Sequence, residues 1–145
     1  MIKIICIGKL KENYLSDFID DYNKRISKYH KISIIELKEE KTIDIEADSI
    51  MKHIRKSDYV ITCDIEGNQI DSIQLSKLID MTFINHSTID FVIGSSEGLS
   101  DKIKKKSNYS LSLSMCTFPH GVFRAILLEQ IYRSFKIINN ETYHK

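Results

Sequence analysis

Short apolar runs alternate with segments of helical periodicity along the chain, and this alternation constrains the fold more than any other feature. The apolar runs lie at Ile2–Ile7, Ile32–Leu37, Tyr59–Cys63, Ile89–Ile93 and Leu111–Met115. Each run has the length of a strand and is followed by a segment that favours a helix. Alternating strands and helices build an α/β domain, and nearly continuous apolar strands fit a mainly parallel sheet buried on both faces. We expect five or six strands flanked by helices.

The helical segments are expected at Asn13–Lys28, Ile43–Arg55, Ser72–Thr82, Ser100–Lys106 and from Pro119 onward. The first has the clearest pattern, with Tyr14, Phe18, Tyr22 and Ile26 recurring at three- and four-residue steps. The chain has 145 residues with only one proline and five glycines, and this low content of loop-forming residues indicates few long loops and no disordered segments. We therefore predict one domain spanning residues 1–145.

Charge and cysteine content limit the possible functions. The formal net charge is +1, so any nucleic-acid surface must come from local clustering of basic residues. No apolar stretch reaches the length of a membrane span, and the run at Ile2–Ile7 is too short for a signal peptide. We expect a cytoplasmic protein with no membrane association. Cys6, Cys63 and Cys116 form no CxxC pair, and the histidines have no ligand spacing, so we expect no metal site.

One strand-to-helix junction contains the chain's only proline. Leu111, Leu113 and Met115 alternate with serines, a turn follows, and Pro119 opens a long helical pattern. Proline is favoured in the first turn of a helix, where its missing N–H has no partner to lose. His120 and Arg124 lie four residues apart and therefore share a face near the positive end of that helix. The junction is either an ordinary βα unit or a small-ligand site.

Three loops follow predicted strands, where ligands bind in parallel α/β sheets. They are residues 63–68, 94–98 and 114–118. Gly94 and Gly98 would allow the backbone to approach a bound group closely, although a plain turn is the alternative. The loop matches neither GxGxxG nor a P-loop, and Glu97 would repel a phosphate. A neutral or cationic ligand fits it better than a polyphosphate.

Two basic segments are candidates for RNA contact. Lys105 belongs to the run at residues 102–106, which is either a solvated helix face or a phosphate-binding surface. The ending Tyr143-His144-Lys145 combines ring surface with charge, which suits an unpaired base, although chain ends are commonly frayed. The last helix is apolar on more than one stripe, so it packs centrally or against a second subunit.

The chain resembles the ribosomal large-subunit RNA methyltransferase H family, which belongs to the SPOUT, or α/β-knot, class. The resemblance covers essentially the full chain. It rests on the loop at residues 93–100, the run Leu111–Ser114, the junction Thr117–His120, Arg124, residues 128–133 and 135–137, and the ending Tyr143–Lys145.

The resemblance implies a homodimer that uses S-adenosylmethionine to methylate N3 of a pseudouridine in the 23S rRNA of assembled ribosomes. It also implies that the C-terminal part is threaded into a trefoil knot. Carried over by position, the cofactor residues are Cys63, Gly94, Leu113, Ser114, Met115, Cys116, Thr117 and Phe118. The chain departs from common family patterns at Cys63, Ser95 and Gly121, where members often carry leucine, glycine and a larger side chain. We expect these changes to alter cofactor affinity modestly.

Roles in the reaction follow from its chemistry. N3 must lose a proton to become a good nucleophile, so a cation that stabilises the anion and a base that takes the proton would both help. Arg124 is the candidate cation. His144, from a partner subunit's tail, and His120 are the candidate bases, with water as an alternative acceptor. Tyr143, Lys145 and Lys105 are candidate substrate-binding residues.

Three other functions compete with this hypothesis. The chain could be a non-catalytic nucleotide-binding module associated with the ribosome. It could be a small flavodoxin-like or Rossmann-like redox or regulatory domain, although it lacks GxGxxG and its most suggestive loop comes late in the sequence. It could also be a structural dimerisation protein built on the apolar last helix.

Overall fold

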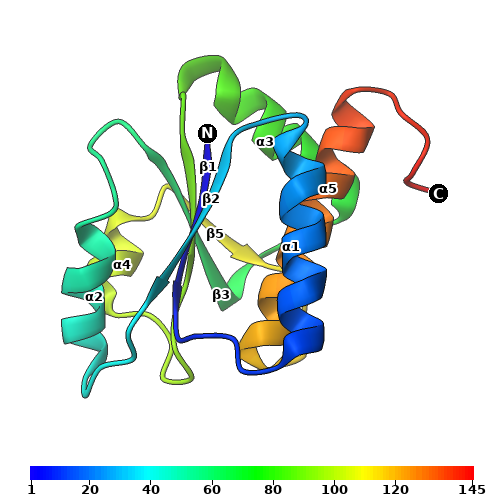
Figure 1. Cartoon of the computed structure of the whole chain (residues 1–145). Coiled ribbons are helices and arrows are strands. Elements are labelled where there is room, and N and C mark those ends of the chain that lie inside the picture. Colours follow the sequence, from blue (N-terminus) through cyan, green and yellow to red (C-terminus); the bar gives the residue numbers. More distant parts are fainter.

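Five parallel strands form the central layer of the structure, a computed structural model that describes residues 1–145 (Figure 1). The strands are β1 (Ile2–Ile7), β2 (Ile32–Leu37), β3 (Tyr59–Gln69), β4 (Ile89–Ile93) and β5 (Tyr109–Ser112). Their order in the sheet is β2-β1-β4-β3-β5, and all four pairings are parallel. The mainly parallel sheet expected from the sequence is thus confirmed, with five strands.

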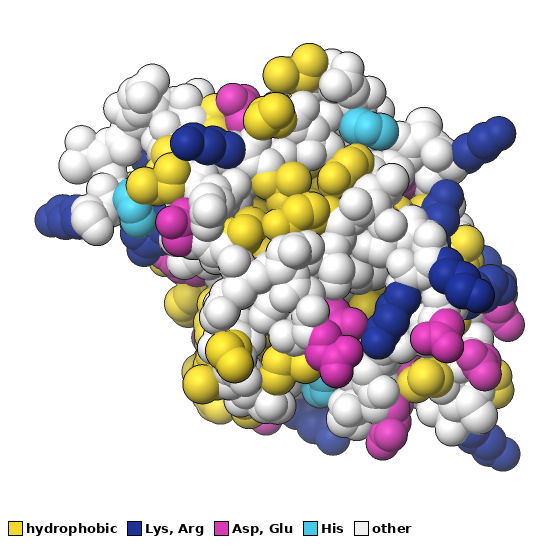
Figure 2. All heavy atoms as spheres, turned by 180° about the vertical axis from the view of Figure 1, so that it is seen from behind, with side chains coloured by type: hydrophobic (Ala, Val, Ile, Leu, Met, Phe, Trp, Pro, Cys, Tyr) yellow, Lys and Arg dark blue, Asp and Glu magenta, His cyan; other side chains and the backbone are white.

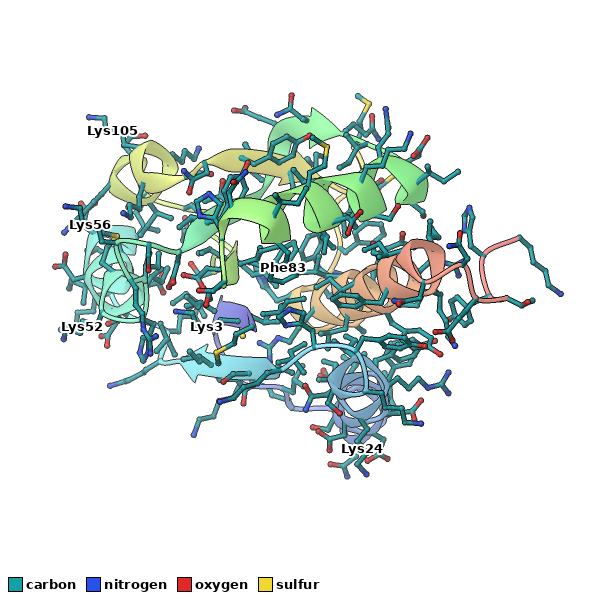
Figure 3. All side chains as sticks on the ribbon, turned by 90° about the horizontal axis from the view of Figure 1, so that it is seen from above. Lys3, Lys24, Lys52, Lys56, Phe83 and Lys105 are labelled. Atoms are coloured by element: carbon teal, nitrogen blue, oxygen red, sulfur yellow. The ribbon has the colours of Figure 1, made fainter.

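Helices cover both faces of the sheet. Viewed from above, α1 (Asn13–Ser27), α3 (Ser72–Asn85) and α5 (His120–Ile138) lie on one face (Figure 3). The other face carries α2 (Ile43–Met51) and α4 (Asp101–Lys106). The larger core cluster, 19 buried residues, packs the sheet against the three long helices, and a cluster of 8 lies under the two short ones. Strands β1 and β4 are fully buried, as their continuous apolar sequences predict.

Helix starts follow local capping chemistry. The Thr42 hydroxyl accepts a hydrogen bond from the Ile45 N–H, and Asp71 forms a reciprocal capping box with Gln74. Pro119 is the N-cap residue of α5, in agreement with the predicted helix start at this proline. All five helices begin within one residue of their predicted positions.

The strands differ from prediction around the third loop. β5 ends at Ser112, so residues 113–115 lie in a connection and not in the predicted strand. The Ser112 hydroxyl donates to the Ser114 carbonyl at 3.0 Å, and the Ser114 hydroxyl accepts from the Cys116 N–H at 3.0 Å. Serine side chains that bond to nearby backbone in this way compete with ladder hydrogen bonds and favour a turn. The apolar alternation alone overestimated the strand.

β3 is longer than predicted, because residues 64–69 continue the strand after an irregularity. The added part pairs with β5, with Asn68 opposite Leu111 and Gln69 opposite Ser112. Gly67 permits this pairing, since a Cβ there would lie 2.8 Å from the Ser110 carbonyl carbon. The predicted exit loop is therefore partly strand. Helix α2 is shorter than predicted and ends at Met51, where the chain passes into turns.

A buried ion cluster lies at the amino end of the sheet, away from the predicted loops. Lys3 Nζ is 2.8 Å from an oxygen of Asp58 and 3.2 Å from an oxygen of Asp90. Burial raises the pKa of Asp90 to about 7, an effect that the nearby Lys3 ammonium only partly offsets. Its position at the amino edge points to a role in stability, because ligands bind at the opposite edge in such sheets.

None of the helices combines the length and apolar character that a membrane-spanning segment requires. The trefoil threading implied by the family resemblance stays a prediction.

Candidate functional site

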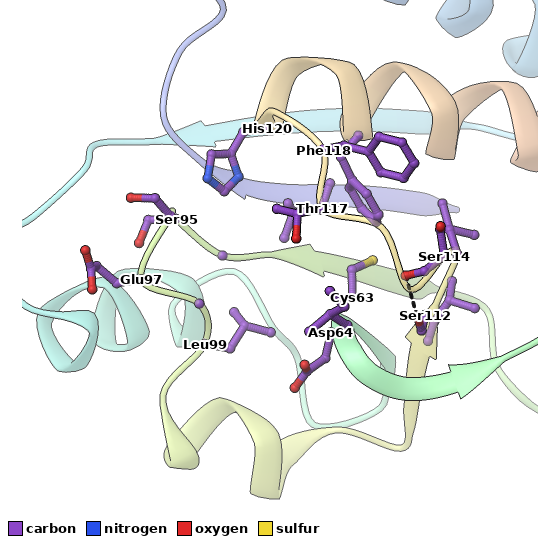
Figure 4. Close-up of a pocket in the computed structure, with 18 of the residues that line it drawn as sticks. Cys63, Asp64, Ser95, Glu97, Leu99, Ser112, Ser114, Thr117, Phe118 and His120 are labelled. Atoms are coloured by element: carbon purple, nitrogen blue, oxygen red, sulfur yellow. Dashed lines mark hydrogen bonds between the residues drawn. The ribbon is translucent and has the colours of Figure 1, made fainter.

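A cavity of about 290 Å³ opens beside the irregular part of β3 and the carboxyl ends of β4 and β5 (Figure 4). Its walls come mainly from the three segments that the sequence predicts as ligand-binding loops. The first wall is residues 63–65, where the pairing of β3 becomes irregular, and the second is residues 93–99 at the end of β4 and beyond. The third is residues 111–118 without Met115, at the end of β5 and beyond, and Lys104, His120 and Phe123 complete the lining. Three strand ends that are distant in the sequence thus meet at one site, as the parallel topology requires.

The loop after β4 is shaped by its two glycines. A Cβ at Gly94 would lie 2.5 Å from the carbonyl oxygen of Gly98 and 2.8 Å from its carbonyl carbon. Gly98 has a φ of +84°, a conformation that glycine adopts without strain. The Gly98 N–H donates to the Ser95 carbonyl at 2.9 Å, which closes the loop on itself. The loop therefore exposes backbone at close range to anything in the cavity.

The third loop completes the cavity. Leu113, Ser114, Cys116, Thr117 and Phe118 all line it. The serine-mediated turn described above fixes the path of this segment across the cavity wall. In Figure 4, Thr117 and Phe118 lie on the connection that leads into the helix beginning at His120.

Seven of the eight residues predicted to bind a cofactor therefore surround one space. The eighth, Met115, does not line the cavity, and 78% of its surface is exposed. Cys63 does line the cavity, and burial raises its pKa to about 12, so its side chain is a neutral thiol at physiological pH. Such a thiol contributes packing surface and no charge. No group of three or more metal-ligating side chains could hold a metal ion.

A second cavity of about 360 Å³ adjoins the first. The two share Ser95, Ser96 and His120 as lining residues. The second is otherwise lined by residues 7–12, 14, 15, 39, 119, 121, 122 and 124. The first turns of α1 and α5 and the loop after β1 form most of its wall. His120 is thus positioned at the junction between two neighbouring spaces.

Arg124 lines the second cavity and not the first. Its side chain is almost fully buried, and Nη1 donates to Glu36 Oε2 at 2.6 Å. Nη2 donates to the Gly8 carbonyl at 3.1 Å, while Nε has no partner in the protein. Arg124 was predicted as the cation that stabilises the N3 anion, and in the structure it is paired with Glu36. Sequence gave no signal for this pair, whose members lie 88 positions apart.

The C-terminal tail follows the end of α5 (Figure 1), whereas both cavities are lined by residues at the start of this helix. The helix has 19 residues and is therefore about 28 Å long. His144 and Lys145 are exposed there, and Tyr143 is half-buried. None of these three predicted site residues meets the cavities of its own chain.

The tail is held in place by side chains of α1 and α5. The Tyr143 hydroxyl donates to Glu129 at 3.0 Å and lies 3.0 Å from the Tyr22 hydroxyl. The Arg133 guanidinium lies over the Tyr143 ring and donates to Nδ1 of His144 at 3.1 Å. The ring of Tyr143, predicted to stack on RNA, is thus already packed within its own chain. Its observed role is to anchor the tail, which leaves His144 outward.

Lys105 is exposed on α4 (Figure 3), next in sequence to Lys104, which lines the first cavity. Its neighbours Lys102 and Lys104 form ion pairs with Asp48 and Asp64 at 2.8 and 3.3 Å. These exposed pairs reduce the positive field of the run. From behind, Lys and Arg side chains gather on the side of α2 and α4, with hydrophobic side chains in the middle of that face (Figure 2). The run is therefore a mixed-charge surface.

Comparison with known proteins identifies a family. A family model described as Predicted SPOUT methyltransferase matches residues 1–144. The chain is 48% identical over 157 aligned positions to the ribosomal RNA large subunit methyltransferase H of Clostridium botulinum strain Alaska E43, with 99% of each chain covered. It is 46% identical, with the same coverage, to the protein of that name from Clostridium tetani.

Solved structures share the fold at low sequence identity. A probable methylase family protein from Haemophilus influenzae matches with a TM-score of 0.54 and 15% identity, over 99% of this chain and 70% of that one. The SpoU methyltransferase AviRb from Streptomyces viridochromogenes, solved in complex with AdoMet, matches with a TM-score of 0.50 and 12% identity. The match covers 92% of this chain and 57% of AviRb. At these identities the similarity concerns the fold.

Proposed function

Because this chain belongs to the SPOUT methyltransferase family, we propose that it transfers a methyl group from S-adenosylmethionine to N3 of a pseudouridine in 23S rRNA. The observation that carries this proposal is the first cavity, where the glycine loop and two further strand ends meet around one space. Its position agrees with the cofactor residues that the family resemblance implies. We propose that the protein acts on ribosomes in the cytoplasm.

The residues of the first cavity fit S-adenosylmethionine. The cradle at Gly94 admits no side chain, so a ligand there meets backbone N–H and carbonyl groups, which suit an adenosine or a methionine moiety. Leu113, Phe118 and the neutral Cys63 thiol give an apolar wall for a ring system. Glu97, which would oppose a polyphosphate, is compatible with a cationic sulfonium ligand. When bound, the cofactor would supply an electrophilic methyl carbon whose bond to sulfur breaks as N3 forms a bond to it, leaving the electron pair on sulfur.

The chain's own residues would handle the proton of N3. His120 is half-buried between the two cavities, so a neutral imidazole there could accept that proton. Arg124, predicted as the cation that stabilises the N3 anion, has a structural contact that favours a positioning role. It ties the first turns of α5 to Glu36 and to the Gly8 carbonyl, and so holds the wall on which His120 sits. We propose that Arg124 mainly positions this wall.

We further propose that the active unit is a homodimer. The tail of one chain lies about one helix length from its own cavities, so His144 could reach a cavity only in another copy. The anchoring of Tyr143 by Glu129 and Tyr22 supports this arrangement, because a docked tail presents His144 and Lys145 outward from a fixed base. The partner's tail would then contribute the second candidate base and a cation for the substrate.

Two measurements test the proposal. Isothermal titration calorimetry should show S-adenosylmethionine binding to the purified protein. Mass spectrometry of 23S rRNA from a strain lacking the gene should show an unmethylated pseudouridine that regains one methyl group when the gene is restored. A protein that binds no S-adenosylmethionine would instead favour the non-catalytic ribosome-associated module. Unchanged rRNA in the deletion strain would rule out the proposed substrate.

A further inference from the structure

We propose that the second cavity receives the target nucleotide, with Tyr14 as a stacking platform and Lys9 and Lys11 as phosphate contacts at its rim. This inference rests on the proposed function, since it assigns the RNA-binding part of the same site. None of these three residues was predicted as a site residue from the sequence, where Tyr14 appears only in the apolar pattern of the first helix. Together with the cavity they form a binding site for an unpaired pyrimidine nucleotide within RNA.

The second cavity lies directly beside the proposed cofactor cavity. Direct displacement requires the nucleophilic nitrogen and the methyl carbon to be in contact and aligned. A base bound in the second cavity would meet a cofactor bound in the first only where the two spaces join, and they join at Ser95, Ser96 and His120. The geometry therefore offers two adjacent chambers for two reactants, with a titratable side chain between them.

The lining of the second cavity combines apolar and polar side chains. Leu10, Leu15 and Val122 give the cavity apolar surface for the faces of a base. The serine pair at 95–96 and the carboxylates of Glu12 and Glu39 offer hydrogen-bonding groups for base edges and ribose hydroxyls. A pocket with apolar walls and a few polar groups is the usual form of a small-molecule or nucleotide site.

The rim of the second cavity carries an exposed tyrosine and two exposed lysines. Tyr14 lines the cavity, yet 70% of its surface is exposed. The other tyrosines of this helix and its neighbours, Tyr22, Tyr29 and Tyr132, pack into an aromatic cluster. Lys9 and Lys11 are exposed beside the same cavity, and neither forms an ion pair. Unpaired RNA bases are recognised by stacking on such rings, while nearby cations bind the phosphates.

Two carboxylates, the exposed Glu36 and the buried Glu46, tie the walls of the second cavity together. Glu36 accepts hydrogen bonds from Arg124 and from the Leu10 N–H at 3.2 Å, so it joins α5 to the loop after β1. Glu46, 3% exposed, accepts from the Ser95 hydroxyl at 2.8 Å and from the Glu40 N–H at 3.1 Å. It thereby joins the glycine loop to the loop that carries Glu39. A cavity with fixed walls binds its ligand with less ordering cost.

Substitutions at the rim test the proposal. Tyr14→Ala should raise the KM for ribosomes about tenfold, the effect expected for the loss of one base–aromatic stack. Tyr14→Phe should keep the wild-type KM, because the ring remains. Lys9→Ala combined with Lys11→Ala should weaken co-sedimentation with 70S ribosomes and flatten its dependence on salt, because two phosphate contacts are lost. S-adenosylmethionine affinity, measured by calorimetry, should remain within twofold of wild type in all three variants.

Matched controls lie elsewhere on the surface. Lys24→Ala combined with Lys28→Ala makes the same charge change at the far end of α1, and Ile84→Ala removes a side chain that is 76% exposed. Both should behave as wild type. Wild-type KM and ribosome affinity in the Tyr14→Ala and Lys9/Lys11 variants would overturn the proposal. Co-sedimentation needs no methyl transfer, so it reports on this surface even if the proposed methylation proves wrong.

Discussion

Replacing Gly94 with alanine should weaken cofactor binding while the protein stays folded. The added Cβ would lie 2.5 Å from the Gly98 carbonyl oxygen, whereas non-bonded carbon contacts are relaxed at about 3.5 Å or more. The atoms in conflict are backbone atoms, which cannot rotate away as a side chain can. Either the end of β4 or the turn at Gly98 must therefore move by about 1 Å.

The size of the effect follows from that movement. Overpacking of a well-packed site costs about 1–3 kcal/mol. Gly94 lies directly after β4, whose five residues are all buried, so the less constrained turn at Gly98 is expected to shift. This shift changes the cavity wall and misaligns the backbone groups proposed to face the cofactor. Losing about 1.4 kcal/mol of binding free energy corresponds to a tenfold weaker affinity, and we expect at least that.

Calorimetry with S-adenosylmethionine and urea unfolding of the same samples measure the two quantities. Gly121→Ala is the matched control, because a Cβ there meets the ends of the Leu15 and Leu10 side chains, which can adjust. Alanine is also the better helix former, by up to about 1 kcal/mol. The control should bind the cofactor normally. Normal cofactor affinity in a folded Gly94→Ala protein would refute the proposal that this loop contacts the ligand.

Three further predictions follow from the structure. Arg124→Ala should lower both the free energy of unfolding and the turnover, because Glu36 loses its partner and the wall beside His120 loosens. Cofactor affinity should stay near normal. Urea unfolding and initial rates measure these effects, and wild-type turnover would exclude Arg124 from a role in the reaction. Deleting residues 143–145 should leave the cofactor affinity unchanged but reduce methylation of ribosomes at least tenfold, measured by methyl incorporation; normal incorporation would exclude the tail from the site. The folded pKa of Asp90, about 7, exceeds its unfolded value near 4, so this group's contribution to stability is present below pH 4 and lost as pH rises to 7. Urea unfolding at pH 5 and pH 8 should show a smaller loss for Asp90→Asn than for wild type, and equal losses would contradict the assigned pKa.

Much of the fold could be predicted because the relevant signals are local. Apolar runs of strand length, capping residues such as Asp71 and the proline at position 119 act within a few residues of one another. The three loops that form the first cavity also followed from strand ends, since parallel topology brings the carboxyl ends of neighbouring strands to the same edge.

Long-range pairing explains what the sequence could not reveal. Glu36 and Arg124 lie 88 positions apart, and Glu46 and Ser95 lie 49 apart, so no periodic pattern connects them. The extension of β3 likewise depends on its pairing with β5 and not on its own polar sequence. Tyr143 was predicted to contact RNA because an aromatic residue stood beside basic ones. Only the packing of α1 against α5 shows that its ring and hydroxyl are already engaged.

The central claim is that this protein methylates N3 of a pseudouridine in the ribosome. Ribosomes from a strain lacking the gene can be incubated with purified protein and S-adenosylmethionine bearing a deuterated methyl group. After nuclease digestion, tandem mass spectrometry identifies the modified nucleoside. We expect one deuterated methyl group on N3 of a pseudouridine in 23S rRNA. A methyl group on another atom or another nucleoside, or no incorporation at all, would contradict it.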